Sequence, residues 1–320
     1  MNATAEIAER EQWLAHRPFD PRQPQGFFLE KEPDERGESA DVATIFLTNR
    51  ECPWRCIYCD LWKSTLTETV PPGAIPAQID VALQQLHRKA CSQIKLYNAG
   101  SFFDPKAIPP NDFAAIAERV RRFQRVIVEC HPALVDESAV QFRDLLRAGP
   151  MATRLEVAMG LEIADDAILA KLNKRMTLAM FARAARFLRE HDIALRAFVI
   201  VKPPFVREEN RALAFAKQSI DFAFGCGATV VSLIPARFGS SALEMLAARG
   251  EFSPPKLSTL EEALNYGVGL RLSRVFADLW DLEKFAECSS CFAARRERLD
   301  AMNQQQIVLP PSTCRLCNAE

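Results

Sequence analysis

Three cysteines stand within eight residues of the chain, in the segment ECPWRCIYCDLW (51–62), with the spacing Cys52-x3-Cys56-x2-Cys59. Cysteine thiolates bind iron–sulfur clusters, and a 4Fe-4S cluster normally takes four of them. No fourth cysteine lies close by, since the next in the chain is Cys91. A cluster held by three thiolates keeps one iron open to a small molecule, and an open position generally indicates chemistry rather than a structural role.

A second group of cysteines stands near the end of the sequence as two C-x2-C pairs. Its members are Cys288, Cys291, Cys314 and Cys317. Four thiolates at this spacing predict a closed tetrahedral metal site. Zinc is the simplest occupant, and a second 4Fe-4S cluster is the alternative. Three arginines lie between the pairs and face either an anionic substrate or solvent: Arg295, Arg296 and Arg298.

Composition is that of a globular protein, with 48% hydrophobic and 25% charged residues in a chain of 320. The net charge of −1 provides no overall attraction to nucleic acid or to an anionic membrane. The first residues lack the apolar segment of a signal peptide, and no run of about 18 apolar residues predicts a membrane helix. Ten cysteines in such a chain favour metal binding in a reducing cytoplasm over disulfides.

Short apolar runs rich in β-branched residues alternate with longer helical patterns. The predicted strands are 43–49, 92–98, 125–131, 154–162, 193–201 and 228–236, and helices are predicted near 76–90, 110–122, 136–148, 164–190 and 207–224. Strands that alternate with helices indicate a parallel sheet buried on both faces. The predicted fold is therefore α/β, a partial (β/α)6 TIM-like barrel with parallel strands and a small C-terminal extension in which four cysteines bind a metal.

The same pattern predicts four segments. Residues 1–40 form an irregular N-terminal extension, 41–240 the core barrel, 241–284 a helical extension that includes a helix around 258–280, and 285–320 the metal-binding segment. In parallel α/β folds the chemistry lies beyond the carboxyl ends of the strands. The loop of Cys52 follows the first predicted strand, so its place agrees with a functional site.

The motif C-x3-C-x2-C, with Tyr58 before its last cysteine, resembles the radical S-adenosylmethionine (SAM) superfamily. The resemblance implies that SAM binds the open iron of a 4Fe-4S cluster. It also implies that an external donor of the flavodoxin or ferredoxin type supplies an electron. Cleavage of SAM then gives a 5′-deoxyadenosyl radical that abstracts hydrogen from a substrate. The motif does not identify further catalytic residues.

The resemblance also implies SAM-binding positions at strand ends. Asn98, Gly100 and Ser101 occupy the place of a glycine-containing SAM motif, although they depart from its commoner Gly-Gly-Glu form. Glu129 and Glu162 end apolar strands, where a carboxylate needs a polar partner such as SAM or a salt bridge. Basic residues near the strand ends are candidates for carboxylate or phosphate contacts: Lys174, Lys202 and Arg237.

A narrower resemblance is carried by Gly160-Leu161-Glu162, by Asn173 to Thr177 and by Lys202-Pro203-Pro204-Phe205. These segments resemble the branch of the elongator catalytic subunit, and within it the family of the archaeosine-synthase radical SAM subunit. The family implies a modified tRNA base or related nucleoside as substrate. The near-zero net charge and the lack of a basic stretch leave a free small molecule as the alternative.

Two other classes of function compete with a radical enzyme. An iron–sulfur electron carrier or redox sensor would hold the cluster of Cys52 without binding SAM. A zinc-bearing nucleic-acid module would use only the tail cysteines, and it leaves the loop of Cys52 unexplained.

Overall fold

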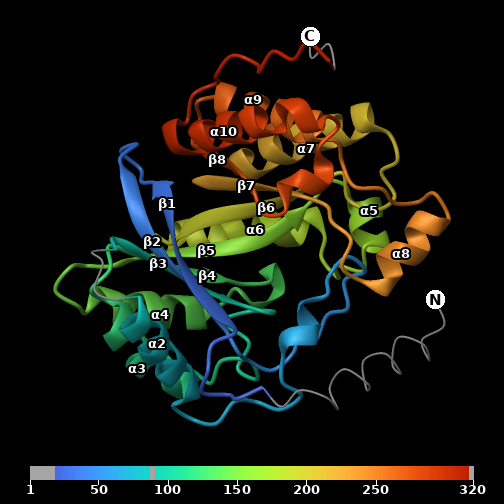
Figure 1. Ribbon diagram of the computed structural model, residues 1–320. Coiled ribbons are helices and arrows are strands. Elements are labelled where there is room, and N and C mark those ends of the chain that lie inside the picture. The colour runs from blue at the N-terminus through green and yellow to red at the C-terminus, as the bar shows by residue number, and fades with distance from the viewer. Residues whose placement is uncertain (1–18, 87–90, 317–320) are drawn as a thin grey trace.

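One curved, eight-stranded sheet forms the centre of the protein (Figure 1). The computed structural model describes residues 19–86 and 91–316. The strands are β1 (Gly26–Pro33), β2 (Ser39–Leu47), β3 (Gln93–Asn98), β4 (Arg125–Glu129), β5 (Arg154–Glu162), β6 (Ala194–Val201), β7 (Val230–Pro235) and β8 (Arg274–Ala277). Their order in the sheet follows the chain from β1 to β8.

Six of these strands, β2 to β7, are the six that the sequence predicts. Each pair from β2 to β8 is parallel, whereas β1 pairs with β2 in the antiparallel direction. Burial on both faces accounts for their apolar sequences, as in β3 and β4, where only the last or next-to-last residue is partly exposed. The predicted α/β half-barrel is therefore confirmed, within a mixed sheet of eight strands.

Helices surround the sheet, and most of them cover its outer side (Figure 1). They are α2 (Ala74–Gln85), α3 (Phe113–Val120), α4 (Glu137–Arg147), α5 (Asp166–Lys171), α6 (Leu178–Glu190), α7 (Glu209–Gly225), α8 (Ser241–Ala248), α9 (Leu257–Gly269) and α10 (Ser289–Gln305). Short 3-10 turns are η1 (Leu61–Ser64), η2 (Pro110–Asp112), η3 (Pro132–Leu134) and η4 (Leu282–Phe285). Neighbouring helices such as α3 and α4, or α7 and α9, pack side by side.

The predicted helix at 164–190 is wrong as a single element, because the chain forms α5, a break, and then α6. Asn173 and Arg175 in the break have φ of 55° and 56°, which a helix does not allow. Thr177 then caps the new helix by accepting a hydrogen bond from the Met180 amide at 3.2 Å. The break brings Asn173 and Lys174 to the same end of the barrel as the cysteine loop.

The prediction of irregular structure is also wrong for 26–33, where β1 lies; residues 1–18 of that segment lie outside the described residues. The charged residues of β1 interrupt the apolar run by which a buried strand is predicted from sequence. Glu32 is buried, and its carboxylate accepts hydrogen bonds from Lys95 and Arg196 on β3 and β6. Glu156 lies in the same ion-pair network, which fills the amino-terminal end of the half-barrel.

The segment 241–284 is not purely helical, because it ends with the short strand β8 at the edge of the sheet. The side-chain amides of Asn303 and Gln306 each pair with both backbone groups of one β8 residue, Ala277 and Val275 respectively, at 2.8–3.0 Å. These amides replace a neighbouring strand and cover an edge that would otherwise stay open. The four segment boundaries stay predictions. No helix in the described ranges is long and apolar enough to cross a membrane.

Candidate functional site

The cysteine loop, residues 50–60, lies beyond the carboxyl end of β2 and is fixed by contacts with distant segments. The Ile57 amide donates to the Leu172 carbonyl at 3.1 Å, and the Asn173 side chain donates to the Arg55 carbonyl at 2.6 Å. The Ser240 hydroxyl donates to the Ile57 carbonyl at 3.0 Å. The loop is therefore held by protein contacts from the segments that follow β5 and β7.

The three thiols of this loop are partly buried. Burial raises the pKa of Cys52, Cys56 and Cys59, the last to about 12, and the charge of the Cys56 thiolate raises the pKa of the other two further. Thiolates that are costly to form in the free protein are stabilised when a cation binds them. The sequence predicts these three residues as ligands, and the structure brings them to one end of the half-barrel.

Gly100 follows β3 and lies directly against the cysteine loop. Its φ of 131° is a conformation that residues with a side chain rarely adopt. A Cβ at this position would stand 3.3 Å from the Cβ of Cys52. A side chain here would crowd the cysteine loop, so glycine at 100 lets the end of β3 approach Cys52 closely.

Asn98 and Ser101 flank this glycine but differ in their surroundings. Asn98 is 3% exposed, and neither its side-chain nitrogen nor its oxygen has a hydrogen-bond partner among the described residues. A buried amide without partners is costly unless a ligand supplies them. The Ser101 hydroxyl, by contrast, accepts a hydrogen bond from the His131 amide at 2.8 Å and so connects β3 to the end of β4.

Glu162 and Lys174 form a buried ion pair beside the cysteines, with 2.6 Å between the Lys174 Nζ and the Glu162 Oε1. Burial opposes the charge of Lys174, but the negative charges of Glu162, Cys56 and Cys59 together outweigh it, and the pKa of Lys174 is raised. Burial and the nearby Glu162 raise the pKa of Tyr58 well above its usual range. The pair thus places a carboxylate and an ammonium against the aromatic residue of the cysteine motif.

Glu129 ends β4 in the same region. Burial raises the pKa of its carboxyl to about 8, partly offset by the positive charge of Lys174. The carboxyl is therefore largely protonated near pH 7. A cation bound beside it would favour the ionised form, so Glu129 is suited to receive a positively charged group.

Two ring side chains, Trp54 and His131, support the loop. Their rings stack with centroids 3.9 Å apart and planes 14° apart. The His131 Nε2 lies 3.0 Å from the Lys174 carbonyl, and burial lowers the pKa of the imidazole to about 4. His131 is therefore neutral and acts as a packing platform.

The remaining basic candidates have protein partners. The Lys202 ammonium contacts the Glu209 carboxylate and the Ser253 hydroxyl, the latter at 2.9 Å. Arg237 pairs with Asp278 at 2.7 Å. These pairings account for both charges within the protein, so their role toward SAM or substrate stays a prediction.

The tail cysteines form a second group, at the amino-terminal end of α10. The Sγ atoms of Cys288, Cys291 and Cys314 lie within 4.8 Å of one another, and Cys288 and Cys314 are 3.9 Å apart. Sulfurs around one tetrahedral zinc, with bonds of about 2.3 Å, stand about 3.8 Å apart. The spacing fits a single ion, whereas a 4Fe-4S cluster separates its cysteines over four irons. Cys317 lies outside the described residues.

Two of the three tail arginines, Arg295 and Arg298, face the protein interior. Arg295 and Arg298 are buried, and Arg295 donates to Glu261 on α9 at 2.7 Å. Arg298 donates to the Leu309 and Pro310 carbonyls. They therefore anchor α10 and the chain that follows it, and the expectation that these two face an anionic substrate is wrong.

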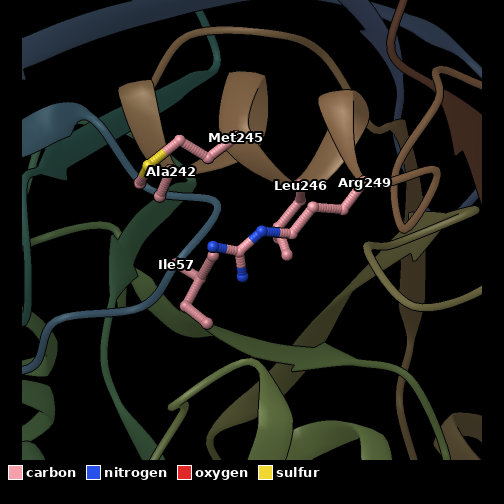
Figure 2. Close-up of a pocket in the computed structure, with 5 residues that line it drawn as sticks. All are labelled: Ile57, Ala242, Met245, Leu246 and Arg249. Carbon is pink, nitrogen blue, oxygen red and sulfur yellow. The ribbon is translucent and has the colours of Figure 1, made fainter. Parts of the chain in front are cut away.

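A small cavity of about 40 Å³ lies between the cysteine loop and α8. Figure 2 shows Ile57 of the loop below three residues of the helix, while the Arg249 side chain extends toward Ile57. The helix residues are Ala242, Met245 and Leu246. This mostly apolar contact covers the side of the loop between Cys56 and Tyr58.

Comparison with known proteins was made by sequence and by fold. No family profile matches the chain. Archaeosine synthase subunit beta of Methanosarcina acetivorans is 26% identical over 238 residues, which cover 71% of this chain and 67% of that protein. A protein of the same name from Thermococcus kodakarensis is 28% identical over 53% of each chain. The chain thus matches about half to two thirds of the length of these relatives.

Among solved structures, methylornithine synthase (PylB) matches with a TM-score of 0.55 and 12% identity, over 85% of this chain and 73% of that one. At this identity the match shows the fold alone. The chain is thus similar in sequence to archaeosine synthase subunit beta and in fold to methylornithine synthase. The predicted resemblance to the archaeosine-synthase subunit family is therefore confirmed, and the half-barrel accounts for the place of the cysteine loop beyond the carboxyl end of β2.

Proposed function

We propose that this chain is a radical SAM enzyme. Cys52, Cys56 and Cys59 would hold a 4Fe-4S cluster, which when bound supplies the electron that cleaves SAM into methionine and a 5′-deoxyadenosyl radical. The observation that carries the proposal is that a glycine and a buried side-chain amide, the latter without a hydrogen-bond partner among the described residues, both lie at the strand end beside the cysteine loop. Gly100 lies against Cys52, and the buried amide of Asn98 lacks partners, among the described residues, that a bound ligand would supply.

The residues around the loop would have different roles in binding SAM. The amide of Asn98 would satisfy polar groups of the methionyl part, and Glu129 would ionise against its ammonium. Glu162 and Lys174 would hold Tyr58 in place beside the last cysteine. Residues 51–60 would stay fixed by their bonds to Leu172, Asn173 and Ser240, which keeps the reacting groups oriented and water excluded.

Substrate, reductant and location follow from the relatives and from the chemistry. The similarity to archaeosine synthase subunit beta favours a modified tRNA base or related nucleoside, with a free small molecule as the second candidate. The electron donor would be a flavodoxin or ferredoxin, and the protein would work in the cytoplasm, where thiols stay reduced.

The test is anaerobic reconstitution with iron and sulfide, followed by dithionite and SAM. We expect release of 5′-deoxyadenosine, with none from the Cys56→Ala variant. A fully loaded cluster that neither binds SAM nor cleaves it would instead indicate the electron carrier.

For the tail we propose a zinc ion bound by Cys288, Cys291, Cys314 and Cys317. The 3.9 Å between two of the sulfurs supports one ion over a second cluster. Metal analysis of the reconstituted protein should give about four irons and one zinc per chain. About eight irons would contradict the zinc site and leave the radical enzyme intact.

A further inference from the structure

Tyr97 and Glu129 stand next to each other at the carboxyl ends of two neighbouring strands. Tyr97 is the only residue of β3 that is not buried, and Glu129 is the only such residue of β4. The register pairs Leu96 with Val128, which are the residues directly before them. Each strand thus leaves one side chain accessible at the end of the half-barrel where the cysteine loop lies.

The ring of Tyr97 points into the half-barrel. Its centre lies 6.1 Å from that of Phe198 on β6. Two strands separate β3 from β6 in the sheet, so the two rings meet across its concave side. Phe46 on β2 lies 6.4 Å from the same ring and is 37% exposed, although residues 42–45 and 47 of its strand are buried. Tyr97 therefore faces an inner surface that solvent and small molecules can reach.

The hydroxyl of Tyr97 is not used by the protein. The chain has three tyrosines, and all three are described. Tyr58 shares a hydrogen bond with Glu162, and Tyr266 donates one to Asp221 at 2.8 Å. The Tyr97 hydroxyl has no hydrogen-bond partner among the described residues. Its O–H group is therefore available to a molecule that enters the half-barrel.

The phenol of Tyr97 keeps its proton at neutral pH. Burial raises its pKa above the usual value, and the positive charges of Lys95 and Arg196 offset this only in part. The Lys95 ammonium lies 6.0 Å from the centre of the ring but is paired with Glu32 and Glu30, and its own pKa is raised, so it does not act as a base. The phenol can therefore lose its proton only together with an electron, as a hydrogen atom.

This property matters in a radical reaction, because a carbon radical needs a hydrogen atom to end as a stable product. The O–H bond of a phenol is weaker than most aliphatic C–H bonds, so transfer from a phenol to an alkyl radical is favourable. We propose that Tyr97 is a catalytic residue that gives its phenolic hydrogen atom to carbon radicals formed in the half-barrel, a role that rests on the proposed function.

The step balances with the electron donor that the proposed function already requires. The O–H bond of Tyr97 breaks, a C–H bond forms on the former carbon radical, and a tyrosyl radical remains. One electron from the flavodoxin or ferredoxin and one proton from water then restore the phenol.

The test measures the source of the hydrogen in 5′-deoxyadenosine when no substrate is present. The reconstituted full-length protein is given dithionite and SAM in D2O, without air and without added thiols. The Tyr97 hydroxyl exchanges with the solvent because the residue is partly exposed, whereas C–H bonds do not exchange. We expect 5′-deoxyadenosine that carries one deuterium atom, as seen by mass spectrometry.

The variants differ in which hydroxyl they remove. Tyr97→Phe keeps the ring beside Phe46 and Phe198 and should give 5′-deoxyadenosine with deuterium at background only. Tyr266→Phe on α9, whose hydroxyl bonds to Asp221 on α7, is the matched control and should give the same deuterium content as the unaltered protein. The deuterium content is a ratio per molecule formed, so it does not depend on how much SAM is cleaved.

Two results would overturn the role of Tyr97: 5′-deoxyadenosine without deuterium from the unaltered protein, or undiminished deuterium from Tyr97→Phe. The first needs no variant, so it decides even where Tyr97→Phe does not fold. Failure of the proposed function would look different, because a fully loaded cluster would then form no 5′-deoxyadenosine in any of these proteins, and the role of Tyr97 would fall with it.

Discussion

The protein has two groups of cysteines, and they are built in opposite ways. The loop of Cys52, Cys56 and Cys59 is fixed by hydrogen bonds to the segments after β5 and β7. Its three sulfurs, which all belong to described residues, do not lie within 4.8 Å of one another as those of the tail do. In the tail, Cys288 and Cys314 have their sulfurs 3.9 Å apart, but the chain around Cys314 lacks regular structure. The loop thus has a shape before a metal arrives, and the tail would rely on the metal for its shape.

The two groups of cysteines also differ in the pKa values of their thiols. Burial raises the pKa values of the loop thiols, while backbone amides at the start of α10 lower the pKa of Cys288. The amino-terminal end of a helix stabilises a thiolate even before a metal binds, and the thiolate is the form that binds a metal ion. The loop thiols depend on the charge that binds them. This contrast is the one expected between a reactive centre in the loop and a structural metal site in the tail, as we propose.

The largest effect is expected from the loop. Cys56→Ser should remove SAM cleavage to background, because the cluster loses one of three ligands and the remaining two cannot hold it. The zinc content should stay at about one per chain, since the tail is separate. Iron, zinc and 5′-deoxyadenosine are measured on the same sample. Cleavage at the unaltered rate would show that Cys56 is not a ligand.

The next effect tests the ion pair that supports the loop. Lys174→Met would leave the Glu162 carboxylate buried without its partner at 2.6 Å, and should lower the free energy of unfolding by about 3–5 kcal/mol. Urea unfolding measures this change. The double variant Glu162→Gln/Lys174→Met should recover part of the loss, because no charge stays buried alone. Equal losses in the single and double variants would contradict this account.

A third prediction concerns the pH dependence of SAM binding. The Glu129 carboxyl has its pKa raised to about 8, and its ionised form is the one that attracts the SAM ammonium. The ionised fraction rises about ninefold between pH 6 and 7 and about fivefold between pH 7 and 8, so the affinity should rise with pH and level off above 8. Glu129→Gln should bind weakly with no such slope. An equal slope in both proteins would assign the titration to another group.

Sequence patterns predicted the six parallel strands because apolar, β-branched runs are what strands buried on both faces require. They missed β1, whose charges are satisfied only by Lys95 and Arg196 from distant strands, and they missed β8, which has four residues. In the site, the cysteines were visible through their spacing. The stacking of Trp54 on His131 and the unpartnered amide of Asn98 depend on the folded chain, so no local pattern carries them.

The smallest effect on chemistry is expected in the tail. Cys288→Ser should remove the zinc and leave SAM cleavage by the folded protein within about twofold, because the cysteine loop is held by Leu172, Asn173 and Ser240, which lie outside α10 and the tail. The segment 311–316 should become sensitive to protease, while residues 50–60 should stay protected by their bonds to Leu172 and Asn173. Limited proteolysis with mass spectrometry compares the two regions in one experiment. Protection of 311–316 without zinc would mean that the hydrogen bonds from Arg298 to the Leu309 and Pro310 carbonyls suffice to hold the tail. The tail would then not depend on a metal for its shape, which would contradict the proposed difference between the two cysteine groups.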